Sequence, residues 1–203
     1  MSATASAGEP ATLEEFFTDN GVSTATAEAL QQKYDGGTLL DSMRGASPVG
    51  SREVGTANEL KTITTFPDGS ISVTTVERPT TSTSGGFSTK AVGNCAKKTT
   101  SHYSTTYHDC AAEASDGVLT VGMHLTYTLV SGTGDTINEI TTPYQFARGG
   151  QAATPKISIQ RKTETSAGPA YARGSTQFSG SAGSYTGTMY VKVGGDKAWT
   201  TGW

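Results

Sequence analysis

Hydrophobic and polar residues alternate along much of the chain, and the clearest example is the segment 118–131, VLTVGMHLTYTLVS. Six apolar side chains, from Leu119 to Leu129, occupy every second position, and His124 is one of the polar residues between them. A period of two is typical of a strand with one face in the core. The segment therefore predicts a long strand that crosses a whole sheet.

A β-hairpin is predicted over 61–77, KTITTFPDGSISVTTVE. Its turn is the Pro-Asp-Gly sequence at 67–69, in which proline fixes one φ angle and glycine accepts a positive one. A type I turn with a glycine bulge would place Ile63 and Val73 on one face, whereas a two-residue turn would group Phe66 with Val73. The pattern fits both registers, so it predicts the hairpin and leaves its register open.

The first fifty residues show a helical pattern instead. Thr12 and Glu15 have the spacing of a capping box, and Ser23 is placed to cap a second helix that ends at Gly36. We therefore expect two short helices over 12–35, which form an appendage that docks on the rest of the protein. A DNA-reading role is not expected, because the second helix offers a single cation.

These patterns predict a mainly β protein: an antiparallel β-sandwich of about seven to nine strands over 55–203, with a short two-helix segment before it. Residues 12–48 are expected to form a helical appendage, and 1–11 a disordered N-terminus of the mature chain. Composition agrees, because 34% hydrophobic and 16% charged residues with 25 glycines are typical of a turn-rich β protein.

The chain has two cysteines, Cys95 and Cys110, at close spacing in a polar and lightly charged sequence. An even cysteine count in such a chain predicts one disulfide in an exported protein. Closing a loop of this length stabilises a fold by about 3 kcal/mol in the chain-entropy model. Small residues at 3–7 resemble the surroundings of a signal-peptidase site, so we expect a secreted, extracellular protein with no transmembrane segment.

Motifs for catalysis, metals and nucleic acids are weak, and we predict no catalytic residue, metal or cofactor. His102, His108 and Cys110 share one strand parity, but their spacing matches no known zinc signature. No G-x-S-x-G nucleophile turn occurs, and His108 and Asp109 are neighbours that would point to opposite faces of a strand. A net charge of −3 without a basic run argues against nucleic acid.

Tyrosines among Ser, Thr and Gly suggest a binding role, because such rings give contact area at a low ordering cost. The segment between the cysteines contains Tyr103 and Tyr107, flanked by His102 and His108, and we take these four as the candidate contact surface. The alternative is that half of the tyrosines lie in the core or in cross-strand pairs.

Several segments resemble uncharacterised secreted proteins of Gram-positive actinobacteria. They are GVSTATAEALQQKYDGGTLLDSM, SPV, FPDGSISVTTVERP, and the two cysteines followed by DGVL and HLTYTLVSG. The resemblance covers about three quarters of the chain, from residue 13 to residue 140. It implies secretion and a β-rich fold behind a helical N-terminus, and it brings no activity or catalytic residue.

The sequence thus favours a non-catalytic protein that contacts an extracellular protein, a cell-wall or cell-surface polymer, or copies of itself. An extracellular polysaccharide hydrolase is the first alternative, with Glu113, Asp116, Asp135 and Glu139 as the acids nearest to strand ends. Such an enzyme requires two carboxylates in a cleft at a fixed separation. An inhibitor or toxin-complex component is the second alternative, and its mark would be a protruding, ordered 95–110 segment.

Overall fold

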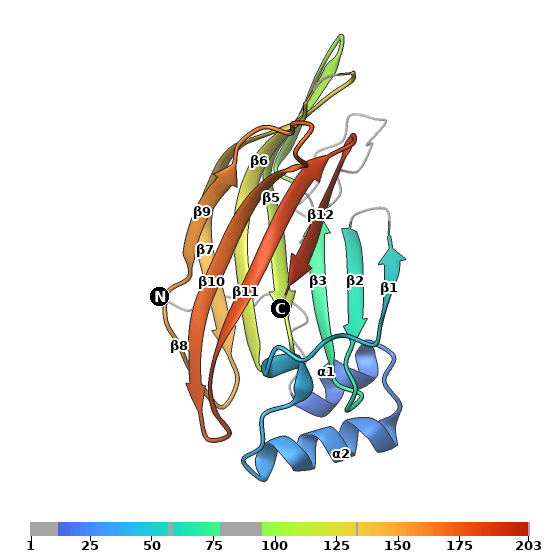
Figure 1. Cartoon of the computed structure of the whole chain (residues 1–203), viewed down its shortest axis with the longest axis vertical. Coiled ribbons are helices and arrows are strands. Elements are labelled where there is room, and N and C mark those ends of the chain that lie inside the picture. Colours follow the sequence, from blue (N-terminus) through green and yellow to red (C-terminus); the bar gives the residue numbers. More distant parts are fainter. Residues whose placement is uncertain (1–11, 57–58, 78–94, 133, 203) are drawn as a thin grey trace, which may run out of the picture.

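The computed structural model of the chain describes residues 12–56, 59–77, 95–132 and 134–202. Within these ranges, twelve strands form two antiparallel sheets that pack face to face, so the predicted β-sandwich fold class is confirmed (Figure 1). The expected disordered N-terminus, 1–11, lies outside the described residues. None of the described helices is long and apolar enough to cross a membrane.

The larger sheet has seven strands in the order β1-β2-β3-β5-β6-β7, with β4 paired to β5. Their bounds are β1 Gly50–Gly55, β2 Glu59–Thr65, β3 Ile71–Glu77, β4 Lys97–Ser101, β5 Ser104–Ser115, β6 Leu119–Val130 and β7 Thr136–Ala147. The smaller sheet has five strands in the order β12-β11-β10-β8, with β9 paired to β10. Their bounds are β8 Gly150–Ala152, β9 Lys156–Arg161, β10 Ala170–Gly180, β11 Gly183–Gly194 and β12 Lys197–Gly202.

The strands number more than the seven to nine expected, and the sheet begins at Gly50, before the predicted boundary at residue 55. Every residue of β1 and of β4 is exposed, and β8 has three residues. A strand that buries neither face has no need for alternating apolar residues, and a very short one cannot display a period. These strands therefore left no periodic signal in the sequence.

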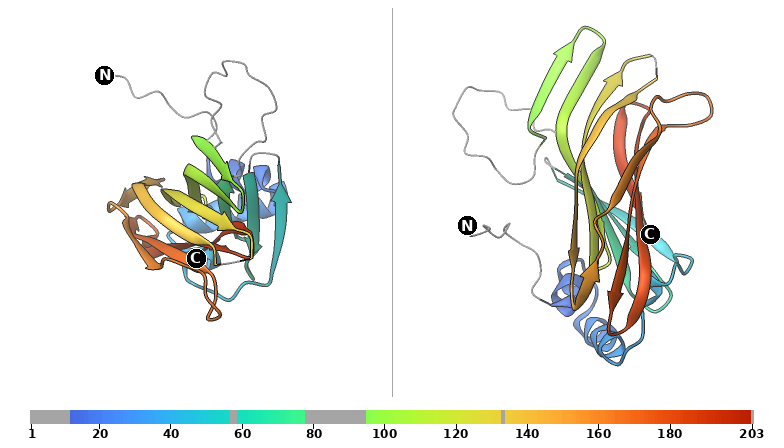
Figure 2. Two further views of the ribbon diagram at one scale, coloured as in Figure 1. Left: turned by 90° about the horizontal axis from the view of Figure 1, so that it is seen from above. Right: turned by 90° about the vertical axis from the view of Figure 1, so that its left-hand side faces the viewer.

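The predicted helices are present as α1 Leu13–Asp19 and α2 Thr24–Asp35, followed by a single 3₁₀ turn, η1 Asp41–Met43. Thr12 and Glu15 form the expected capping box, and Ser23 accepts a hydrogen bond from the backbone N–H of Thr26. The helices lie at one end of the sandwich, and the β4–β5 hairpin projects from the other (Figures 1 and 2). Buried residues of both helices belong to the same core cluster as the sheets, so helices and strands share one core.

The core between the sheets follows the alternation of β6. Its predicted inward residues from Leu119 to Tyr127 are at most 3% exposed, whereas His124 is half-buried on the opposite face. Gly174 of β10 lies opposite this row, where an added Cβ would be 2.8 Å from Met123 Cε. The sheets therefore meet closely at the middle of the sandwich.

The hairpin of β2 and β3 has the register of the type I turn with a glycine bulge. Ile63 lies opposite Val73, and Gly69 has a φ of +86° and donates its N–H to the Phe66 carbonyl. Positive φ at the third turn residue is the feature that glycine provides. Of the two registers that the sequence left open, the hairpin therefore has the one with the glycine bulge.

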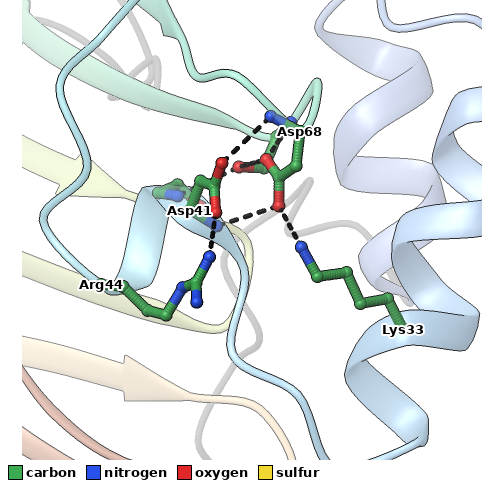
Figure 3. A network of polar contacts seen from close by, with 6 residues as sticks. Lys33, Asp41, Arg44 and Asp68 are labelled. Atoms are coloured by element: carbon green, nitrogen blue, oxygen red, sulfur yellow. Dashed lines mark hydrogen bonds and ion pairs between the residues drawn. The ribbon is translucent and has the colours of Figure 1, made fainter.

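A polar network joins this hairpin turn to the helical segment (Figure 3). Asp68 accepts hydrogen bonds from Lys33 Nζ at 2.7 Å, from the Asp41 N–H at 3.0 Å and from the Ser70 hydroxyl at 2.6 Å. Asp41 accepts in return from the Asp68 N–H and forms an ion pair with Arg44. Burial opposes ionisation of Asp68, but these donors outweigh it and lower its pKa to about 2.

A charge at an inward position of β6 should unfold the sandwich. Leu125 is 1% exposed, so Leu125→Asp would place an unpaired carboxylate in the core and should lower the free energy of unfolding by several kcal/mol, on the order of 4 or more. His124→Gln, one residue away on the half-buried face, should cost about 1 kcal/mol or less. Thermal and urea unfolding measure both, and the reverse order would mean that the faces of β6 are inverted.

Loss of the Asp68 charge should destabilise the protein in a pH-dependent way. The folded carboxyl has its pKa lowered from 3.8 to about 2, which corresponds to about 2 kcal/mol of stability at neutral pH. This stability is present above pH 4 and is lost as the pH falls toward 2, because between these values the unfolded carboxyl binds a proton while the folded carboxyl is still ionised. Urea unfolding of Asp68→Asn should therefore differ from wild type at pH 7 and converge with it near pH 2. An equal difference at both pH values would contradict the assignment.

Candidate functional site

The five-stranded sheet faces the viewer in Figure 1. Its outer face carries an ordered array of aromatic and basic side chains. Even-numbered residues of β10, such as Ala172 and Phe178, are buried against the other sheet, so its odd-numbered residues face outward. The register places the outward residues of four neighbouring strands in rows. We call this array the aromatic–basic face, and its members are Arg161, Tyr171, Arg173, Tyr190, Lys192 and Trp199.

Cations and rings alternate along the rows of this face. Tyr171 is paired with Arg161 on one side and with Lys192 on the other, and Lys192 is paired in turn with Trp199. In the next row Arg173 lies opposite Tyr190. Tyr171 and Tyr190 therefore each have basic neighbours, both across the sheet and along their own strands.

Direct contacts hold several of these side chains in place. The Arg161 guanidinium lies 5.5 Å from the Tyr171 ring centroid and donates to the carbonyls of Ala167 and Pro169, each at 3.2 Å. The rings of Tyr171 and Tyr190 are 6.4 Å apart. A hollow of about 300 Å³ is lined by Arg161, Pro169, Tyr171, Tyr190 and Lys192. The face thus combines a shaped depression with preordered rings.

The face is basic although the chain as a whole is acidic. Strands β8 to β12 contain five Lys or Arg residues and no Asp or Glu, whereas the whole chain has 15 cations and 18 acids. The acids nearest in sequence, Glu164 and Asp196, lie between strands, and Glu164 accepts from the N–H groups of Asp135 and Gly195. The strands of the five-stranded sheet therefore carry a net positive charge.

The residues of the sequence-predicted contact surface do not share one face. Tyr103 and His102 lie at the tip of the projecting β4–β5 hairpin, where Tyr103 is 74% exposed. Tyr107 is instead a cross-strand partner of the buried Tyr127, with ring centroids 5.0 Å apart. Its half-buried ring packs against the core cluster. Tyr107 therefore fits the alternative in which tyrosines form cross-strand pairs.

Cys95 and Cys110 are joined by the predicted disulfide. A bulge at Asp109, whose φ is +53°, lies between His108 and Cys110, so the parity that grouped them in the sequence is broken. Asp109 contacts His124 Nδ1 at 2.8 Å rather than its neighbour His108. Among the residues that the structure describes, no group of three or more His, Cys, Asp or Glu side chains is positioned to hold a metal ion.

The acids considered for a hydrolase are distributed over the fold. Glu113 accepts from the Tyr144 hydroxyl at 3.2 Å, and burial raises the pKa of Glu113. Asp116 is fully buried and accepts from the N–H groups of its own turn and from the Tyr185 hydroxyl at 2.7 Å. Glu139 is exposed on β7. Glu113 and Asp116 are thus held by neighbouring turns and strands.

Asp135 lies at one end of the sandwich, beside a hollow of about 340 Å³ that Glu164 and Asp196 help to line. It accepts from the N–H groups of Val130 and Asp196, and its pKa is raised by burial and by the nearby charges of Glu164 and Asp196. These bonds tie the connection between β6 and β7 to the connection between β11 and β12. We therefore assign Asp135 a role in turn structure.

Comparison with known proteins gives no family and no function. No protein-family model matches the chain, and no curated protein matches it. A crystal structure of a hypothetical protein from Listeria monocytogenes EGD-e aligns with 76% of this chain and 93% of its own, at 16% identity and a TM-score of 0.36. A match at this level carries no argument about what the protein does.

Sequence reasoning missed the aromatic–basic face, although two signals point to it. Tyr171 and Arg173 are two residues apart, as are Tyr190 and Lys192, which is the spacing of one strand face. From residue 150 onward the chain has six Lys or Arg and only two acids. The pairing of the two strands, which brings these residues together, is not visible in either segment alone.

Proposed function

We propose that this protein is a secreted, non-catalytic binding protein that attaches to a cell-surface polymer through its aromatic–basic face. The observation that supports this proposal is the alternation of Tyr171 and Tyr190 with Lys192 and Arg173 on a rigid sheet. Rings with one apolar body and one polar end give contact area at a low ordering cost. The long pair of strands β10 and β11 holds these side chains in a fixed geometry, so no loop has to become ordered when a ligand binds.

The disulfide supports an extracellular location, because such bonds persist in oxidising compartments. An extended, shallow surface suits a chain-like ligand that lies across several strands. An enzyme acting on a small substrate normally encloses most of it in a pocket. These features favour a protein that attaches to a polymer over an enzyme that converts a small substrate.

Removal of the two rings should weaken retention on insoluble cell-wall material from Gram-positive bacteria. We expect Tyr171→Ala with Tyr190→Ala to reduce the retained fraction of oxidised protein about tenfold, since buried aromatic anchors dominate contact energies. Sedimentation with the polymer, followed by quantification of the soluble fraction, measures this. Thermal unfolding must show that the double variant is still folded.

Tyr103→Ala is the matched control, because Tyr103 is an exposed tyrosine on the other sheet, at the hairpin tip. It should leave retention unchanged. Retention that depends on Tyr103 and not on the Tyr171–Tyr190 pair would transfer the contact surface to the hairpin and overturn the proposal.

A further inference from the structure

We infer that the ligand of the aromatic–basic face is a linear acidic polysaccharide, one with carboxylate groups at intervals along a chain of sugar rings. This inference rests on the proposed function and specifies the chemistry of its ligand. It is carried by the arrangement of charges and rings on the face.

The rings of the face account for the sugar part of the ligand. Tyr171 and Tyr190 are half-buried, so each presents part of a ring to solvent while its position is fixed by the sheet. The apolar C–H surface of a sugar ring can pack on such a ring, and the hydroxyl group of tyrosine remains available for hydrogen bonds. Two rings on adjacent strands would support neighbouring units of one chain.

The cations account for the charge of the ligand. Arg173 is exposed and Lys192 is half-buried, and the strands that carry them contain no acid to neutralise them. Arginine and lysine favour carboxylate partners, arginine through its planar fork of donors. A neutral polymer could form no ion pairs with these cations, whereas the carboxylates of an acidic polymer could.

The spacing of the cations favours a charge at intervals rather than on every unit. Arg161 and Lys192 flank Tyr171 in one row, and two strand spacings separate them by about 10 Å. Within this row, the Tyr171 ring thus lies between the two cations. This pattern matches a polysaccharide in which charged and neutral sugars alternate, and it differs from a nucleic acid, which carries a phosphate on every unit.

Hyaluronan is a suitable probe, because every second sugar bears a carboxylate, and carboxyl-reduced hyaluronan is its neutral counterpart with the same backbone. We expect the oxidised protein to bind hyaluronan and to bind the reduced polymer and dextran at least tenfold more weakly. Binding to hyaluronan should weaken between about 0.01 M and 1 M salt, as the screening length falls from about 30 Å to about 3 Å. Calorimetric titration measures all three polymers.

Charge-removing variants locate the effect. Arg173→Gln and Lys192→Gln should each weaken hyaluronan binding about threefold to fivefold, and both together about tenfold, the range of exposed ion pairs. Lys97→Gln is the control, since Lys97 is an exposed cation on β4 of the other sheet and should have no effect. Arg161 is left unchanged because it also holds the Ala167–Pro169 loop.

The outcomes separate this inference from the proposed function. Equal binding of native and carboxyl-reduced hyaluronan would overturn the acidic ligand and leave a polymer-binding face intact. Tighter binding of single-stranded DNA or of polyglutamate than of hyaluronan would also overturn it, because either result points to charge without sugar specificity. Failure to bind hyaluronan, with retention on cell walls still dependent on Tyr171 and Tyr190, would overturn this inference alone. Loss of that dependence as well would overturn both.

Discussion

Side chains on β10 and β11 alternate between the core and solvent, and the inward half of this strand pair sets its register. Ala172 lies opposite Val191, and Gly174 lies opposite Met189, where an added Cβ would be 2.8 Å from Met123 Cε of the other sheet. A slip of one residue would move every inward side chain to the outer face. The same pairing that fills the core therefore fixes Tyr171 opposite Lys192 and Arg173 opposite Tyr190.

The remaining elements complete this core and hold the ends of the sandwich. The helices close one end of the sandwich. There, the ammonium of Lys33 on α2 lies 2.7 Å from a carboxylate oxygen of Asp68 in the hairpin turn. The disulfide ties Cys95 to the inward-facing Cys110 near the projecting hairpin. Rigid surroundings of this kind give the aromatic–basic face a fixed geometry, which would lower the ordering cost of the proposed binding.

Local sequence signals were sufficient for elements whose structure depends on neighbouring residues. The capping box at Thr12, the glycine turn at Gly69 and the alternation along β6 each have a local physical cause, and each is present in the structure. The disulfide followed from cysteine count and composition. The exposed strands β1 and β4 could not be found in this way, because neither buries a face.

The candidate site depends on pairing between distant strands, and that is why the sequence indicated a different surface. The bulge at Asp109 reverses the side-chain parity that grouped His102, His108 and Cys110. Tyr107 has the local composition of a contact residue but packs on Tyr127. Tyr171 and Tyr190 are nineteen positions apart in the sequence, and only the β10–β11 register makes them neighbours.

The most direct test of the account is an NMR titration of selectively tyrosine-labelled protein with hyaluronan oligosaccharides. We predict that the ring resonances of Tyr171 and Tyr190 shift together with one binding curve, while those of Tyr103 and Tyr107 stay unchanged. Shifts confined to Tyr103 and Tyr107 would place the contact surface on the β4–β5 hairpin and contradict binding through the aromatic–basic face.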